Sequence, residues 1–166
     1  TDTGHEAHSL DVAMEILGGS ETSRLYRALV EDQRIAVSAG ASASSSGLGG
    51  GSVSIWATPV EGVTLEQVEA AADAVIAEFL RDGPTDVELT RAKNSLSANA
   101  IYSRDSQESL ANIYGSSLAQ GESIDDVVNW PANVEAVTRD DVITLSRQTL
   151  DINASVTGWL LPEQGQ

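Results

Sequence analysis

Hydrophobic residues near the start of the chain recur at helical spacing. They predict a short amphipathic helix whose inward face is formed by Leu10, Ala13, Met14 and Leu17. The pair Gly18-Gly19 should end this helix, because glycine tolerates the left-handed conformation found at many helix C-termini. A second helix, running to about residue 33, is expected next, with its first amides capped by one of three hydroxyl side chains, Ser20, Thr22 and Ser23.

From Ile35 the pattern changes to alternation, which indicates a strand buried on one side. Its inward face is predicted to carry Ile35, Val37, Ala39, Ala41 and Ala43. A glycine-rich turn over residues 44–52 follows, and the alternation resumes in a return strand through Val53, Ile55 and Ala57. The sequence therefore predicts a β-hairpin, which ends at Pro59.

Capping signals divide the second half of the chain into helices. Thr64-x-x-Gln67 and Thr85-x-x-Glu88 are capping boxes that open two long helices. Three more helices are expected over about residues 106–119, 124–137 and 139–150, the last two capped by Ser123 and Thr138. Alternation over residues 152–160 predicts a last strand.

The predicted order is two helices, a hairpin, a run of helices and one strand. This order favours the α+β class, with an antiparallel sheet and helices packed on one of its faces. Since three strands are few for so much helix, we expect a further strand of this sheet to precede Thr1. The domain is expected to cover residues 10–161, between a loose N-terminal segment, residues 1–9, and a tail, residues 162–166.

Charge narrows the range of partners. The chain has 25 acidic and 9 basic residues and a net charge of -16 at pH 7, which repels nucleic-acid phosphates and anionic lipid headgroups. No apolar run in the sequence approaches the ~20 residues that a membrane helix needs. We therefore expect neither nucleic acid binding nor membrane insertion. Cysteine is absent, which excludes disulfides and thiolate chemistry.

His5 and His8 mark the only stretch where a metal site can be considered. A helical zinc motif needs two histidines four residues apart, whereas these two are three apart and no third ligand is evident. They are also the only histidine bases for a serine nucleophile, and neither lies near a Gly-x-Ser-x-Gly motif. The glycine-rich turn lacks the Lys-Ser/Thr of a phosphate loop. No catalytic, metal-binding or cofactor-binding residue is predicted.

Trp56 and Trp159 are predicted on the strand faces opposite the small-residue stripe, among small polar neighbours. Two indoles on a fully solvated face would be unusual. Either another domain or a cavity covers this face, or each indole is shielded by its own neighbours.

Two longer stretches resemble a known family. They are ILGGSETSRLYRALVEDQRIAV, residues 16–37, and VTLEQVEAAADAVIAEFLRDGPTDVELTRAKNSL, residues 63–96. Both are similar to the C-terminal domain of the M16 zinc metallopeptidases, which include insulinase, pitrilysin and mitochondrial processing peptidase. The resemblance covers about residues 8–160 and is strongest toward bacterial two-domain members. Its first motif, GG-x-x-x-SRLY, contains Gly18, Gly19, Ser23 and Arg24, and its second is DGPT-x-x-E-L-x-RAKN-x-L.

The resemblance implies a LuxS/MPP-like metallohydrolase fold and a non-catalytic role. The family's zinc site, a His-x-x-Glu-His helix with a distal Glu, belongs to the N-terminal domain and has no match here. Zinc is thus expected in a missing N-terminal catalytic domain, with which this domain would close a chamber around unfolded peptides. Many members also contact the substrate through an Arg and a Tyr seven residues apart. Alignment through LVEDQRIAV places Val30 and Val37 there, and nearby Arg34 is not assigned their role.

Two functions follow from the resemblance. The chain is either the C-terminal part of an active zinc metalloendopeptidase or a domain of a catalytically inactive partner or scaffold subunit. A His-x-x-Glu-His motif before Thr1 would favour the first. The 166-residue chain alone is expected to hydrolyse no peptide. Resemblance to bacterial members suggests the periplasm or cell envelope as its location, and association into a homo-oligomer is left open.

Overall fold

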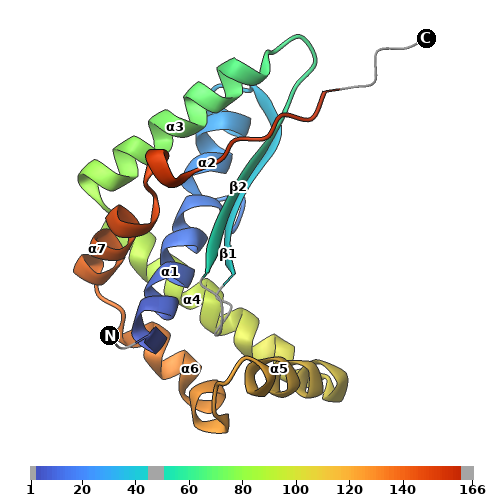
Figure 1. Cartoon of the computed structure of the whole chain (residues 1–166), viewed down its shortest axis with the longest axis vertical. Helices are drawn as coiled ribbons and strands as arrows, with labels where there is room; N and C mark the ends of the chain where they lie inside the picture. The colour runs from blue at the N-terminus through green and yellow to red at the C-terminus, as the bar shows by residue number, and fades with distance from the viewer. Residues whose placement is uncertain (1–2, 45–50, 162–166) are drawn as a thin grey trace.

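The computed structural model describes residues 3–44 and 51–161. Helices form a layer along one side of an antiparallel hairpin (Figure 1). In chain order the elements are α1 (Thr3–Gly18), α2 (Arg24–Tyr26), the π-helix η1 (Arg27–Asp32), β1 (Ala36–Ser44), β2 (Ser52–Pro59), α3 (Leu65–Asp82), α4 (Asp86–Tyr102), the 3-10 turn η2 (Ser103–Asp105), α5 (Gln107–Ala119), α6 (Ile124–Ala136), α7 (Arg139–Thr149) and the 3-10 turn η3 (Ile152–Ala154). The predicted α+β class and helix-covered sheet are confirmed.

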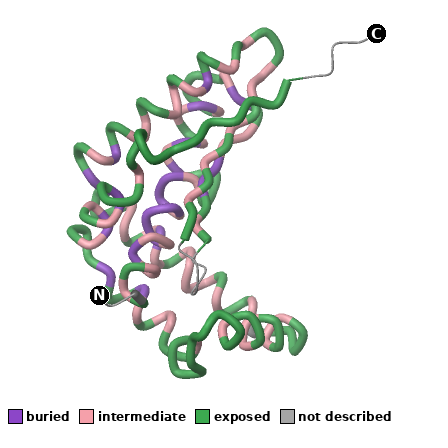
Figure 2. Tube along the Cα trace, viewed as in Figure 1, coloured by how far each residue is buried: buried purple, intermediate pink, exposed green. Residues whose placement is uncertain are grey.

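Helix α1 is the centre of the core. Val12, Ala13 and Leu17 are completely buried, and Figure 2 shows buried residues gathered along this helix. It packs against β1, α4, α6 and α7. The helix begins at Thr3, earlier than the predicted start near Leu10. Its first turns lack a hydrophobic stripe, and they are held by contacts with α6 and α7 that the local pattern does not reveal.

The hairpin contains a bulge that changes which residues face the core. Its register pairs Ala36 with Pro59 and Ser38 with Thr58, so one extra residue, Val37, lies between these pairs. A bulge re-aims the side chain of the extra residue. Val37 is consequently 63 % exposed, whereas Ala36 is buried, and the predicted inward orientation of Val37 is wrong.

The capping predictions for the second half of the chain are confirmed. Helices α3, α4, α6 and α7 each begin with a complete capping box. In each box a Ser or Thr hydroxyl accepts from an amide three residues on, and the side chain of that residue accepts from the cap amide. These reciprocal bonds need only local sequence, which explains why the helix starts were predictable.

Arginines hold the C-terminal end of α3. Its last carbonyls and those of the following turn would otherwise lack partners, and the guanidinium groups of three arginines, one in α2 and two in α7, donate to them. The donor–acceptor pairs are Arg147 with Leu80 and Arg81, Arg139 with Asp82 and Pro84, and Arg24 with Gly83.

The predicted last strand is not formed. Residues 152–154 make the turn η3, and residues 155–161 form no regular element. Val156 and Leu160 are 96 % and 93 % exposed, while Trp159 donates from Nε1 to Glu69 of α3 at 3.0 Å. A strand requires a neighbouring strand to bond its backbone, and the described residues pair none with this segment. The predicted tail, residues 162–166, and most of the glycine-rich turn lie outside the described residues.

Among the helices that the structure describes, none has the length and apolar character needed to cross a bilayer.

Candidate functional site

The two sequence motifs, GG-x-x-x-SRLY and DGPT-x-x-E-L, meet in space. Arg24 of α2 donates from Nε and Nη2 to the two carboxylate oxygens of Glu88, at 2.7 and 2.8 Å. Nη2 also donates to the carbonyl of Gly83 at 2.9 Å, and the guanidinium lies 5.2 Å from the ring centroid of Phe79. Because a bidentate pair fixes orientation as well as distance, this contact docks α2 onto the turn between α3 and α4. It thereby positions η1 and β1, which follow α2 along the chain.

Glu88 is held in its ionised form by its contacts at this junction. Burial alone would raise its pKa, but hydrogen bonds from Arg24 and from the amide and hydroxyl of Thr85 outweigh burial and lower the pKa of Glu88 to about 2. The same pairing raises the pKa of Arg24 above its usual value. Both groups therefore stay charged near neutral pH, and their role is structural rather than acid-base.

The Gly18-Gly19 pair ends α1 in a different way from that predicted. Neither glycine has a positive φ, so the expected left-handed cap is wrong. A Cβ on Gly18 would lie 2.5 Å from the carbonyl carbon of Gly40 and 2.7 Å from Cβ of Ala41. Gly18 is therefore required because the end of α1 touches the backbone of β1.

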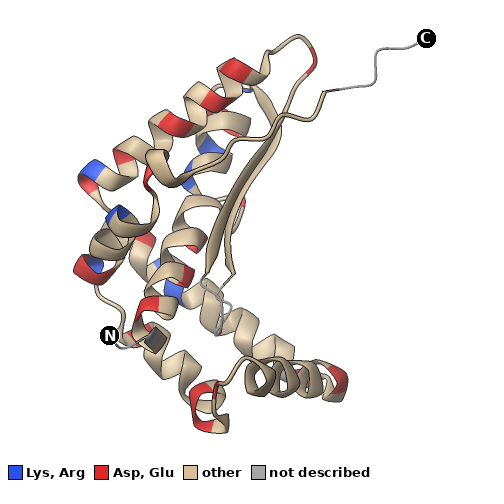
Figure 3. Ribbon diagram, in the orientation of Figure 1, with Lys and Arg blue, Asp and Glu red and all other residues tan. Residues whose placement is uncertain are grey.

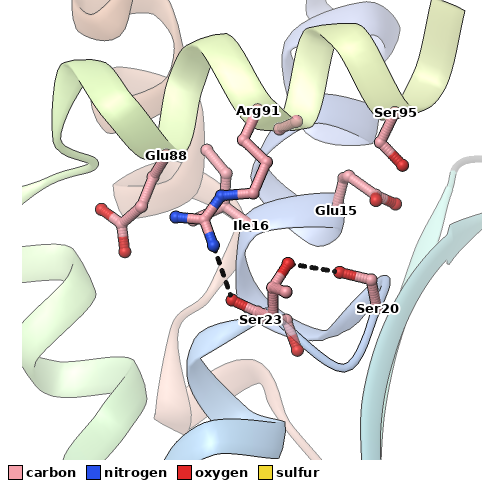
Figure 4. A pocket seen from close by; sticks show the side chains of 9 residues that line it. Glu15, Ile16, Ser20, Ser23, Glu88, Arg91 and Ser95 are labelled. Atoms are coloured by element: carbon pink, nitrogen blue, oxygen red, sulfur yellow. Dashed lines mark hydrogen bonds between the residues drawn. The ribbon is translucent and has the colours of Figure 1, made fainter.

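A hollow of about 210 Å³ lies between α1, the turn that follows it and α4 (Figure 4). Ser23 lines it and is 3 % exposed. Its hydroxyl has no partner among the described residues and does not cap α2, which corrects the capping prediction. Arg91 projects into the hollow and reaches the carbonyl of Thr22 at 3.4 Å. The carboxylate of Glu88, which also lines the hollow, is already paired with Arg24.

The corner between η1 and β1 contains the two predicted substrate positions. The π-helix bonds Gln33 N to Ala28 O, and Ile35 N then reaches Leu29 O at 2.9 Å. Between these bonds Arg34 adopts a left-handed conformation with φ 54°, which is uncommon for a residue with a side chain. Both π-helices and such strained residues are frequent near functional sites. The sequence pattern indicated an ordinary helix here and revealed neither feature.

The two valines of this corner lie in different environments. Val30 is half-buried and packs against the core, whereas the bulge exposes Val37. Neither brings a polar group to the surface, and Arg34 makes no hydrogen bond or ion pair within the described part of the chain. The corner thus has apolar side chains at the two positions where the resemblance leads us to look for an Arg and a Tyr.

The hairpin has an open face that points away from α1. Cross-strand pairing puts eight residues on it, Ser38 with Thr58, Gly40 with Trp56, Ser42 with Ser54 and Ser44 with Ser52. Apart from Trp56, which is 50 % exposed, all are small. The predicted placement of Trp56 opposite the small apolar stripe is confirmed, while that of Trp159 fails because its strand is not formed.

The two histidines do not fit a metal. His5 lies 3.2 Å from Asp141 of α7. His8 instead contacts α6, where its ring is at 87° to that of Trp130 and its Nε2 is 3.3 Å from Asn133. The described residues contain no group of three or more His, Cys, Asp or Glu side chains that could hold a metal ion. The two imidazoles thus face separate helices.

Asp11 lies one turn after His8 and is half-buried. Burial is the main reason that the pKa of its carboxyl is raised to about 6. A hydrogen bond from Trp130 lowers this pKa, and the negative charge of Glu122 raises it. The raised pKa of this carboxyl makes the stability of the folded chain depend on pH.

Comparison with known proteins places these features in a family. The family model described as Peptidase M16 inactive domain matches residues 2–96, more than half of the chain. A curated relative, the uncharacterized zinc protease YmxG of Bacillus subtilis, is 29% identical over 151 residues, which are 89% of this chain and 36% of the relative. The chain thus spans about a third of that protein's length.

Solved structures share the fold at low identity. The inactive peptidase domain of a Bordetella parapertussis protein superposes with a TM-score of 0.82 at 19% identity, covering 95% of this chain and 85% of that one. A protease from Helicobacter pylori gives 0.80 at 19% identity, covering 89% of this chain and 35% of that one. The family match and the shared fold together show that this chain belongs to the peptidase M16 family, as an inactive domain.

Proposed function

We propose that this domain closes the peptide-binding chamber of a zinc metalloprotease whose catalytic domain lies in the rest of the parent protein. The match to the M16 inactive domain carries the proposal. The zinc protease name of the longer B. subtilis relative supports an active parent. The histidines of this chain do not fit zinc, so the metal and the reacting groups would come from the catalytic domain.

A test of this role compares three samples. The purified chain, the separate catalytic domain of the same parent and their equimolar mixture are incubated with an unfolded, fluorescently quenched peptide. We expect chelator-sensitive cleavage by the mixture, at least tenfold faster than by the catalytic domain alone, and none by this chain. Equal rates with and without this chain would contradict the proposal.

The alternative, a domain of a catalytically inactive partner subunit, predicts a different parent. A parent that lacks a His-x-x-Glu-His motif and cleaves no peptide after zinc is added would establish the alternative. The zinc protease name of the B. subtilis relative favours the active form.

We further propose that a strand from the rest of the parent pairs with residues 155–161. Val156 and Leu160 are almost fully exposed although their segment alternates like a strand. Pairing would bond this backbone and cover part of its apolar surface. Amide hydrogen exchange over these residues should slow at least tenfold in the parent relative to the isolated chain, and unchanged exchange would contradict the pairing.

A periplasmic or cell-envelope location remains a proposal that rests on resemblance to bacterial members. Fractionation of cells that express the parent protein tests it, and recovery with cytoplasmic markers alone would reject it.

A further inference from the structure

We propose that the open face of the hairpin binds an extended peptide substrate, with Trp56 contacting an aromatic or large aliphatic side chain. The proposal rests on the proposed function, because it assigns to this domain a peptide contact different from the missing Arg and Tyr. It makes Trp56 a specificity-determining residue. No catalytic step is assigned to it.

The indole of Trp56 packs on the opposite strand, at a position occupied by glycine. Gly40 pairs with Trp56 across the hairpin and is buried beneath it. A Cβ on Gly40 would lie 2.7 Å from Cε2 and 2.9 Å from Cη2 of the indole. The glycine thus allows the ring to lie on the strand, while half of the side chain stays exposed. A ring already held in place loses little conformational entropy when a ligand stacks on it.

The rest of the open face suits a peptide backbone. Its hydroxyl groups can both donate and accept hydrogen bonds, as Ser38 does with Thr58 at 3.2 Å. Neither strand contains a charged residue, in a chain of net charge -16, and the hairpin stands out in Figure 3 as an uncharged ribbon. An uncharged peptide can therefore approach without desolvating a fixed charge.

Composition and position favour a transient peptide over a permanent domain interface. Permanent interfaces are rich in apolar side chains and poor in serine, whereas this face has five serines and only one large apolar residue, Trp56. The face also continues into the bulge at Val37, whose side chain is exposed. A peptide that follows the hairpin from Val37 would pass over Trp56.

The test observes the indole N–H signals of the ¹⁵N-labelled chain by NMR. Replacing each tryptophan by phenylalanine in turn assigns the three signals. The probe is a blocked, uncharged ten-residue peptide of glycine and serine with one central phenylalanine, and its control has alanine at that position. We expect a saturable shift of the Trp56 signal only, with roughly two- to tenfold weaker binding of the alanine peptide, the range given by one aromatic contact.

Matched variants complete the experiment. Trp56→Ala should remove the preference for the phenylalanine peptide, as read from shifts of neighbouring backbone amides, whereas Trp159→Phe, which alters another half-exposed indole, should preserve it. An unmoved Trp56 signal, or equal shifts with both peptides, would overturn the inference. Failure here together with peptide cleavage by the reconstituted parent would leave the proposed function intact. A shifted Trp56 signal without cleavage would reject the proposed function alone.

Discussion

The two sides of the hairpin both depend on a glycine, and they differ in what each glycine faces. On the helix-covered side, Gly18 brings the end of α1 against the backbone of Gly40 and Ala41. On the open side, Gly40 lies beneath the ring of Trp56. Backbone in a packed layer cannot withdraw, whereas an exposed indole can rotate toward solvent. The first contact therefore defines the fold, and the second leaves a side chain available to a ligand.

The largest effect is expected at Gly18. Gly18→Ala would drive a methyl group into the β1 backbone, and we expect it to lower the free energy of unfolding by about 3 kcal/mol or more, the upper end for overpacked sites. Urea denaturation followed by circular dichroism measures this loss. Gly115→Ala, where an added Cβ meets nothing within 4 Å, is the control and should not destabilise the chain. A mild effect at Gly18 would show that α1 and β1 can separate without cost.

Removing the Arg24 junction should have the next largest effect. Arg24→Ala leaves Glu88 and the carbonyl of Gly83 without their charged donor, so we expect a loss of about 2 to 3 kcal/mol. Arg81→Ala removes an ion pair with Asp82 that is exposed on both sides and should change stability little. Equal effects of the two variants in urea denaturation would mean that the contact between the two motifs does not hold the helical layer together.

Asp11 makes the helix-covered side sensitive to pH. The pKa of Asp11 is raised in the folded state to about 6 from 3.8, so the folded chain holds this proton more tightly than the unfolded chain does. Stability from this group is full below about pH 4 and is lost as pH rises through 6, by about 3 kcal/mol at most.

The variant Asp11→Asn keeps an acceptor for Trp130 and cannot ionise. It should therefore be more stable than the natural chain at pH 8, with a much smaller difference at pH 4. Urea denaturation at both values measures the change, and Asp125→Asn, on an exposed carboxylate of α6, serves as the control. A gain of the same size at both pH values would show that ionisation of Asp11 is not its cause.

The smallest effect is expected on the open side. Gly40→Ala should rotate the Trp56 ring outward and cost about 1 kcal/mol, the lower end for overpacking. Fluorescence of a Trp130→Phe, Trp159→Phe background would report greater exposure of Trp56. In a double-mutant cycle, the cost of Gly40→Ala should largely disappear when Trp56 is already alanine. A cost as large as that of Gly18→Ala would remove the distinction between the two sides.

Local sequence was sufficient where the stabilising bonds are local. The capping boxes at Thr64 and Thr85 involve residues three apart, and the helices they open were predicted close to their observed starts. The hairpin followed from alternation. By contrast, the hydrophobic pattern indicated neither the bulge at Val37 nor the π-helix η1. The bulge reversed the orientation predicted for Val37.

By itself the sequence determined the fold class, the starts of the four helices that open with capping boxes, and the family resemblance. The tertiary structure decided that Gly18 serves a close approach instead of a left-handed cap, that Arg24 joins the two motifs and that Gly40 seats Trp56. It also left residues 152–160 unpaired. Each of these depends on segments distant along the chain, and side-chain periodicity reports only which residues of one segment share a face.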